Sequence, residues 1–370
     1  MKSALWIAVT GFLAGVAALA PKEGGESLLS PAEIERGLAD HPPLLGDREG
    51  KRKPFIEALD AWVQRPDTIY WDGKAETAHR EFFAFYLRGI ERALAEAEKT
   101  TVPSGAVVWK LYSSGFLVKT PTATFAFDVS EGPFKSITSK PEDQPGYFFH
   151  WTPAMRQRLA KMVDVFFITH QHYDHLSYAL VREVGAAGKT IVVPPDLRDL
   201  WRKEPFADRL MSLKPDVDHR QGPLTVRVFQ AVQAMKKNDD GDWVVSDSDP
   251  QHYVYLVRDQ AGTGFLHNGD NRGRPFLPWL KQALADGWKL HVWFRIFGWP
   301  STVIQDVEKL ADPVIIPGHN HEVGHKPKYT PSLLGGFYNS MVVGRADKKR
   351  YAVLAWGERL TLDQTSLPGK

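Results

Sequence analysis

The sequence predicts an α/β protein in which two sheet-rich halves are covered by helices. Three observations support this fold class. Along most of the chain, apolar residues at spacings of three and four alternate with short continuous apolar runs. Turn residues such as Ser113-Ser114-Gly115 separate the first of these runs. A hydrophobic content of 43% with twelve tryptophans is enough to fill a substantial core in 370 residues.

Residues 1–20 have the pattern of a signal peptide. MKSALWIAVTGFLAGVAALA carries one lysine, then an apolar run, then small residues ending in Ala-Leu-Ala. We therefore expect a periplasmic or secreted protein. Pro21 is a poor residue directly after a cleavage site, and a run of this length is near the lower limit for spanning a bilayer. A retained membrane anchor is the alternative.

Residues 21–100 are expected to form a linker and an N-terminal helical segment. Ser30-Pro31-Ala32-Glu33 has the form of a helix start, with proline at the first helical position. Between Lys53 and Lys99, apolar residues recur at helical spacing. A helical extension of the main domain is the simplest interpretation.

Residues 101–370 are expected to form the α/β domain itself. The expected strands lie in VVWKLY, GFLVKT, TFAFDV, VDVFFIT, TIVVPP, LTVRVFQAV, HYVYLVR, TGFLHNGD, LHVWFRIF and DPVIIPGHN. The expected helices lie in PAMRQRLAKM, HLSYALVREVGAAG, PFLPWLKQALADG and STVIQDVEKLA.

The composition excludes several classes of function. There are no cysteines, so disulfides, cysteine-ligated zinc and a cysteine nucleophile are absent, and any metal site must use nitrogen and oxygen ligands. Forty-six basic and forty-four acidic residues nearly cancel, whereas a nucleic-acid binder usually shows a strong basic excess. We expect no nucleic-acid partner.

The stretch ITHQHYDHLS, residues 168–177, concentrates metal-ligand side chains after the apolar run VDVFF. On an extended segment, His170 and His172 point the same way and can hold one ion together. As the chain turns toward the next helix, Asp174 and His175 can face a second ion. The alternative is a polar loop whose histidines are surface or capping groups.

Residues 168–177 resemble the signature of the metallo-β-lactamase superfamily, including Thr169 before the first histidine. The resemblance implies a four-layer αββα sandwich with a metal site at the mouth between two sheets, from about Val102 onward. It also implies two later ligands: Asp270 in GFLHNGD, as a carboxylate that bridges two metals, and His319 in VIIPGHN. His321 and His325 lie close enough to His319 to compete with it.

One ligand that the resemblance implies is missing. The family places a third histidine in the region that matches VRVFQAVQAM, where this chain has Gln233 or Ala234 and no histidine before His252. Glutamine is a weaker, neutral donor for zinc-like ions. Asp174, His175, Asp270 and His319 therefore form a complete set. The set of His170 and His172 is one imidazole short, so we expect one or two ions, Zn²⁺ first, with Mn²⁺ or Fe²⁺ as alternatives.

These residues favour an exported metal-dependent hydrolase that acts on an ester, lactone, amide or phosphodiester bond through a metal-activated water. Asp174 and Asp270 are the expected catalytic residues, which orient the water and handle its proton. The motif resembles the lactonase and phospholipase D-like branch, which implies a small-molecule or lipid-like substrate and proximity to a membrane surface. The alternative is a catalytically weak metal- or ligand-binding protein of the same fold.

The string HEVGH, His321 to His325, also matches the zincin protease motif His-Glu-x-x-His. That chemistry needs a helix, so that both histidines face one zinc ion. Pro317-Gly318 before the motif, Gly324 inside it and Pro327 after it are unfavourable to a helix. The zincin interpretation is a remote alternative.

Overall fold

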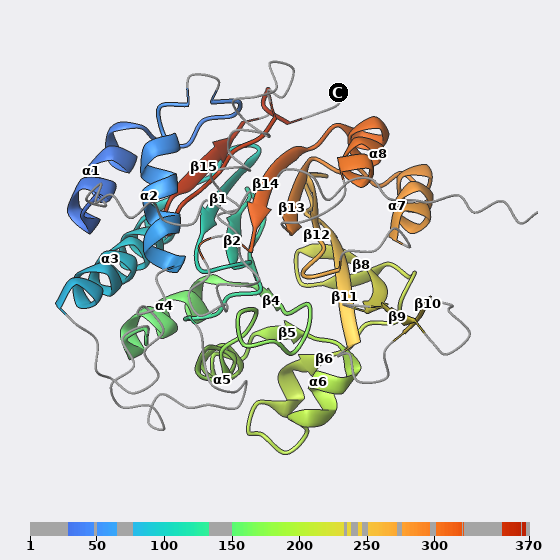
Figure 1. Ribbon diagram of the computed structural model, residues 1–370. Helices are drawn as coiled ribbons and strands as arrows, with labels where there is room; N and C mark the ends of the chain where they lie inside the picture. The colour runs from blue at the N-terminus through green and yellow to red at the C-terminus, as the bar shows by residue number, and fades with distance from the viewer. Residues whose placement is uncertain are drawn as a thin grey trace, which may run out of the picture.

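The computed structural model describes residues 29–47, 50–64, 77–132, 150–232, 235–237, 243–245, 251–271, 276–296, 301–319, 321, 350–363 and 365–367. In this part of the chain, two β-sheets lie face to face between outer helices (Figure 1). The predicted αββα arrangement is confirmed. The expected signal peptide, residues 1–20, lies outside the described residues, and no described helix is long and apolar enough to cross a membrane.

The first sheet has seven strands in the order β15-β1-β2-β3-β4-β5-β6. Strands β15, β1, β2 and β3 pair antiparallel, whereas β3 to β6 pair parallel. Their bounds are β1 Ala106–Lys110, β2 Phe116–Lys119, β3 Thr124–Phe127, β4 Val165–Phe167, β5 Thr190–Val192, β6 Leu210–Met211 and β15 Arg359–Leu362.

The second sheet has six strands in the order β14-β13-β12-β11-β8-β7. Strands β12, β13 and β14 pair parallel, and the remaining pairs are antiparallel. A separate hairpin joins β9 Met235–Lys237 to β10 Trp243–Val245. The bounds of the sheet strands are β7 His219–Gln221, β8 Leu224–Val232, β11 Gln251–Arg258, β12 Gly264–His267, β13 Val292–Ile296 and β14 Val314–Gly318.

Aromatic side chains from alternate strand positions fill the space between the sheets, which is how two inner faces form a common core. Phe116 of β2 stacks on Phe294 of β13 with ring centroids 4.4 Å apart. Phe125 of β3 meets Phe265 of β12 edge to face at 5.3 Å. Both pairs belong to one buried cluster, so the two sheets form one unit rather than two domains.

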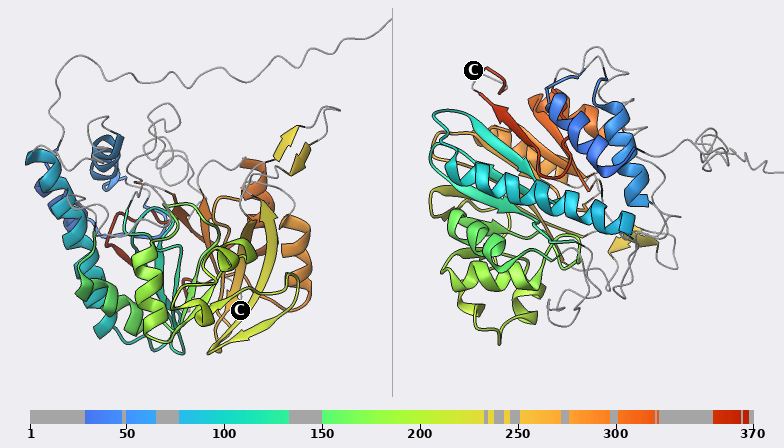
Figure 2. Two further views of the ribbon diagram at one scale, coloured as in Figure 1. Left: turned by 90° about the horizontal axis from the view of Figure 1, so that it is seen from below. Right: turned by 90° about the vertical axis from the view of Figure 1, so that its left-hand side faces the viewer.

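Helices cover the outer faces of both sheets, as Figure 2 shows from below. The first sheet carries α3 Thr77–Lys99, α4 Pro153–Met162 and α5 Tyr178–Ala186. The second sheet carries α7 Phe276–Ala285 and α8 Ser301–Ala311. The N-terminal helices α1 Pro31–Asp40 and α2 Lys53–Gln64 pack beside α3 within the same buried cluster. The N-terminal segment is therefore part of an outer layer.

Helices α4 and α8 have the predicted bounds, whereas α5 and α7 are shorter than the predicted segments, and the segment Lys53 to Lys99 contains two helices, α2 and α3. The Ser30 hydroxyl accepts a hydrogen bond from Glu33 N–H, and the Glu33 carboxylate accepts one from Ser30 N–H at 2.7 Å, which closes a capping box before α1. Short elements escaped prediction: α6 Pro195–Leu200, the 3₁₀ helix Ala207–Arg209, β6, β7 and β15. They contain two to six residues, too few to establish a periodicity.

Candidate metal centre

The predicted ligands come from strand ends in both sheets. The segment 170–175 follows β4 of the first sheet, Asp270 follows β12, and His319 follows β14. Because the carboxyl ends of β4, β12 and β14 meet at the mouth between the two sheets, residues far apart in sequence lie side by side there (Figure 1). The structure groups them as Asp174, His175, Asp270 and His319, and as His170, His172 and Asp270.

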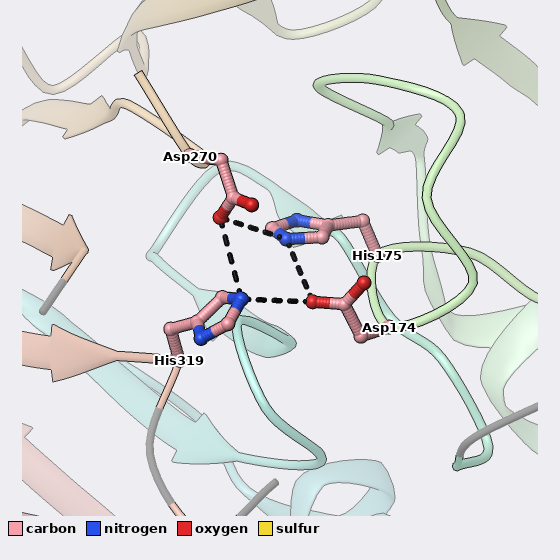
Figure 3. A group of neighbouring side chains, drawn as sticks. All are labelled: Asp174, His175, Asp270 and His319. Atoms are coloured by element: carbon pink, nitrogen blue, oxygen red, sulfur yellow. Dashed lines mark ion pairs between the residues drawn. The ribbon is translucent and has the colours of Figure 1, made fainter. Parts of the chain in front are cut away.

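Four side chains of the first group converge on a common point (Figure 3). His175 Nε2 lies 3.1 Å from Asp174 Oδ2 and 3.0 Å from Asp270 Oδ1. His319 Nε2 lies 2.9 Å from Asp174 Oδ2 and 3.4 Å from Asp270 Oδ1. Nitrogen and oxygen donors thus alternate around a small ring.

This spacing fits a single divalent ion. Bonds of about 2.0–2.1 Å place neighbouring ligand atoms about 2.9 Å apart at right angles and about 3.4 Å apart at tetrahedral angles, and the four separations run from 2.9 to 3.4 Å. His175 Nε2 and Asp174 Oδ2 are buried and make no well-aligned hydrogen bond within the described residues. Buried polar atoms rarely lack a hydrogen-bond partner. One cation bound to both atoms would give each of them a partner.

The second group is less complete. His170 Nε2 lies 2.9 Å from His172 Nδ1 and 3.7 Å from Asp270 Oδ2. Asp270 therefore turns one carboxylate oxygen toward each group, which is the geometry that a bridging carboxylate requires. The second group offers three donor side chains among the described residues, one fewer than the first.

The prediction that His170 and His172 lie on an extended segment is wrong. Strand β4 ends at Phe167, so neither histidine is on an extended strand. The chain bends at residues 170 and 171 and then forms a turn, in which His175 N–H donates to His172 C=O at 3.0 Å. The two histidines therefore lie on either side of a bend rather than on one extended strand.

A glycine is required immediately before Asp270. Gly269 has φ 47°, and a Cβ at this position would collide with Thr169 Oγ1 and His252 Nε2. Only glycine combines a left-handed backbone with this close approach. The Gly-Asp pair therefore brings the Asp270 carboxylate against the segment that carries His170.

His252 lies beside the second group without joining it. The residue is fully buried on β11, and its ring stacks on His170 with centroids 4.4 Å apart at an interplanar angle of 18°. Its Nε2 lies 3.3 Å from Asn268 C=O. Burial lowers the pKa of His252 to about 4, so the imidazole is neutral. Gln233 and Ala234 lie outside the described residues.

Asp128 is a functional residue that the sequence analysis missed. It is fully buried after β3, and its Oδ1 accepts a hydrogen bond from Thr169 N–H at 2.7 Å. Its Oδ2 accepts one from the Thr169 hydroxyl at 2.7 Å and lies 2.7 Å from His175 Nδ1. TFAFDV ends in an aspartate after an apolar run, as GFLHNGD does, and that shared pattern was the available signal.

Asp128 fixes the proton positions on two histidines. His175 Nδ1 donates to the carboxylate, which leaves Nε2 as the metal-facing nitrogen. The Thr169 hydroxyl has one hydrogen, which it donates to Asp128, so its 3.0 Å contact with His170 Nδ1 is accepted from that nitrogen. The Nε2 lone pair of His170 then faces Asp270.

The charges of the group shift its pKa values strongly. Burial works to raise the pKa of Asp174 and of Asp270, but His175 and His319 outweigh it and hold both values well below the usual range. Burial works to lower the pKa of His175, but Asp174, Asp270 and Asp128 outweigh it and hold this pKa well above 6.5. Without a metal, the cluster therefore has ionised carboxylates and a protonated His175 at neutral pH.

Metal affinity is expected to rise with pH, because an ion must displace the proton from His175 Nε2. The carboxylates are already ionised, so the released protons come from histidines, at least one of them from His175, and the metal dissociation constant falls at least about tenfold per pH unit below the raised pKa of His175. Titration calorimetry in buffers of different ionisation enthalpy measures this proton release. Equal affinities at about pH 6 and about pH 8 would contradict the assignment.

The structure also bears on His321, which begins the zincin-like string. His321 has φ 56°, in the left-handed region, so it does not begin an α-helix as that chemistry requires. Glu322 and His325 lie outside the described residues.

No family model matches the sequence, and no curated protein matches it. Among solved structures, an isothiocyanate hydrolase from Delia radicum gut bacteria is 15% identical, with 70% of this chain and 99% of that chain covered and a TM-score of 0.48. A metallo hydrolase from the archaeon Ignicoccus hospitalis is 17% identical, with 69% and 97% covered and a TM-score of 0.44. The metallo-β-lactamase fold protein YhfI from Bacillus subtilis is 12% identical, with 69% and 98% covered and a TM-score of 0.41. None of these likenesses assigns a reaction, a substrate or a metal to this chain.

Proposed function

We propose that this protein is an exported metal-dependent hydrolase of the metallo-β-lactamase fold. One observation carries the proposal: four buried or nearly buried nitrogen and oxygen donors, from Asp174, His175, Asp270 and His319, converge at distances that one divalent ion can span. An ion of the zinc type held there lowers the pKa of water toward neutrality and polarises a scissile carbonyl or phosphoryl oxygen.

The two aspartates supply the acid-base chemistry in this proposal. Because the pKa values of Asp174 and Asp270 are held low, both carboxylates are ionised at neutral pH and accept hydrogen bonds from an attacking water. They would orient the water toward the scissile bond and take its proton as it attacks, and Asp174 or a neighbouring histidine would return that proton to the leaving group. His170 and His172 belong to the second group and line that side of the mouth between the sheets.

The donor set favours Zn²⁺, because imidazole and carboxylate without sulfur suit zinc, with Mn²⁺ or Fe²⁺ as alternatives. The proposed substrate is a small-molecule or lipid-like ester, lactone, amide or phosphodiester. The resemblance of residues 168–177 to the lactonase and phospholipase D-like branch supports this choice. The apolar N-terminal run supports periplasmic or secreted localisation, near a membrane surface.

Metal content and turnover test the proposal together. The metal-loaded protein is assayed against phosphodiester, lactone, amide and thioester substrates, beside His172→Ala, which alters the second group. His219→Ala is the matched control, since His219 lies on β7 and contacts Lys214 C=O at the surface. We expect His219→Ala to match the parent protein on the substrate that is cleaved. Activity of the parent no higher than that of His172→Ala on every substrate would exclude the hydrolase.

The second candidate function is metal or ligand binding without efficient turnover. The second group has three donor side chains among the described residues, and this favours the second candidate, because a site with few donors holds the second of two bridged ions weakly.

Replacing Gln233 by histidine is expected to raise the metal content toward two ions per chain. The new imidazole would supply the donor that the family places in this region, and imidazole binds zinc-like ions better than an amide. Elemental analysis after dialysis measures the content. Gln230→His, at an exposed position of β8, is the matched control. If Gln233→His leaves the content unchanged, the second position lacks more than one ligand.

A further inference from the structure

The loop that carries His319 has a backbone conformation that needs support. His319 directly follows β14 and has φ 60°, and His321 has φ 56°. Non-glycine residues reach this left-handed region at a cost of about 1–2 kcal/mol each. Two such residues within three positions persist only where surrounding contacts hold them.

Part of that support comes from the first sheet, and part from the N-terminal helices. His319 N–H donates to Ser113 C=O, in the turn between β1 and β2, at 3.1 Å. The His321 side chain is buried, and its Nδ1 lies 3.4 Å from Asp60 Oδ1 on α2. Asp60 is itself only 5% exposed. A buried carboxylate of the N-terminal segment therefore meets the loop two residues after His319.

Helix α2 is fixed at its other end as well. The Arg52 guanidinium, at the start of α2, donates to His41 C=O, to the Glu358 carboxylate and to Val353 C=O. The Glu358 carboxylate also accepts from Ala355 N–H at 2.7 Å. These groups are buried or nearly so, so α2 cannot shift without leaving buried charges unpaired.

An aromatic cluster packs against His321 as well. The His321 ring lies edge-on to Trp356 at 6.1 Å. Trp356 in turn packs on Phe82 and Tyr86 of α3, with centroids 5.4 and 4.9 Å away. Well-packed interiors transmit small displacements rather than absorbing them.

We propose that the N-terminal helices are a structural part of the metal centre, and that Asp60 is a positioning residue that holds His319 in place through His321. The proposal goes beyond the hydrolase function and rests on it only for the presence of a metal. It gives the N-terminal segment a defined role: through His321, α2 supports the loop that carries His319.

The test compares Asp60→Ala, His321→Ala and the double variant with Glu57→Ala. Glu57 is the matched control, because it is an acidic residue one turn away on α2 whose side chain is 37% exposed and pairs with Lys53. Zinc dissociation constants are measured by competition with a chromophoric chelator. The visible absorption of the Co²⁺-substituted protein reports the ligand geometry independently of turnover.

We expect Asp60→Ala to weaken zinc binding by about tenfold, the low end of the effect of removing a supporting group around a metal ligand. Its Co²⁺ spectrum should change, while Glu57→Ala leaves both quantities at the parent values. Because Asp60 acts through His321, the double variant should bind zinc no more weakly than the worse single variant. Asp60→Asn should lie between Asp60→Ala and the parent protein, since the amide keeps the size of the carboxylate beside His321 but not its charge.

Equal zinc affinities and Co²⁺ spectra for Asp60→Ala and Glu57→Ala would overturn the proposal, and so would additive losses in the double variant. Circular dichroism confirms folding of each variant, and Asp60→Asn carries the comparison if Asp60→Ala does not fold. A parent protein that binds metal but hydrolyses nothing refutes the hydrolase alone. A parent protein that binds no metal refutes both.

Discussion

Replacing Asp270 by alanine is expected to empty both metal positions and to lower hydrolysis by about 1,000-fold or more, which corresponds to about 4 kcal/mol of transition-state stabilisation. The reason is that the two oxygens of the Asp270 carboxylate face different ligand groups. Oδ1 lies 3.0 Å from His175 Nε2 and 3.4 Å from His319 Nε2, while Oδ2 lies 3.7 Å from His170 Nε2. No other described side chain belongs to both ligand groups.

Elemental analysis of the purified variant measures the first effect, and turnover on the substrate that the parent cleaves measures the second. Asp208→Ala is a suitable control, because Asp208 is an exposed aspartate that pairs only with its neighbour Arg209 among the ion pairs of the described residues. A variant at Asp270 that keeps the parent metal content would refute the assignment of both groups.

Replacing Asp128 by asparagine is expected to weaken metal binding by about 10–100-fold and to cost about 3 kcal/mol of stability. The buried carboxylate serves Thr169 N–H, the Thr169 hydroxyl and His175 Nδ1 together. If the asparagine oxygen keeps the bond to Thr169 N–H, its NH₂ group points at His175 Nδ1. That nitrogen must then accept, so the proton moves to Nε2, where the metal would bind.

Zinc competition and urea denaturation measure the two effects of Asp128→Asn. Asp164→Asn is the matched control, because the Asp164 carboxylate also accepts a backbone N–H, from Thr124 at 2.8 Å, but does not contact the ligands. We expect Asp164→Asn to change stability modestly and zinc affinity not at all. Zinc binding by Asp128→Asn as tight as that of the parent would show that the carboxylate does not set the histidine tautomer.

The fold was predictable because its elements are long or strongly apolar. The helix predicted in PAMRQRLAKM spans these ten residues in the structure. The strand predicted in LTVRVFQAV spans these nine residues. β15 was not predictable, because four residues that alternate between exposed and buried are common in loops. Its strand character comes from pairing with β1, a contact that no local pattern contains.

The candidate ligands were predictable for a related reason. Four of them lie within six residues, and Asp270 and His319 each follow an apolar strand in a family-like order. Asp128 and Asp60 were not predictable, because an isolated aspartate after a strand or on a helix is usually a turn or surface residue. Their roles arise only where the fold brings Asp128 to His175 and Asp60 to His321.

The pairing of β1 with β15 joins residues 106–109 to residues 359–362 (Figure 1). While the chain is being made, β1 therefore keeps an open hydrogen-bonding edge until residues 359–362 have emerged, and such edges invite aggregation. Closure of so long a loop is slow compared with local folding. His319 directly follows β14, in which Ile315 forms an isolated bridge with Tyr351, so the last ligand is also fixed late. We therefore expect the chain to acquire the ion after synthesis, in the compartment where it finishes folding. The metals available in that compartment then determine which ion is bound.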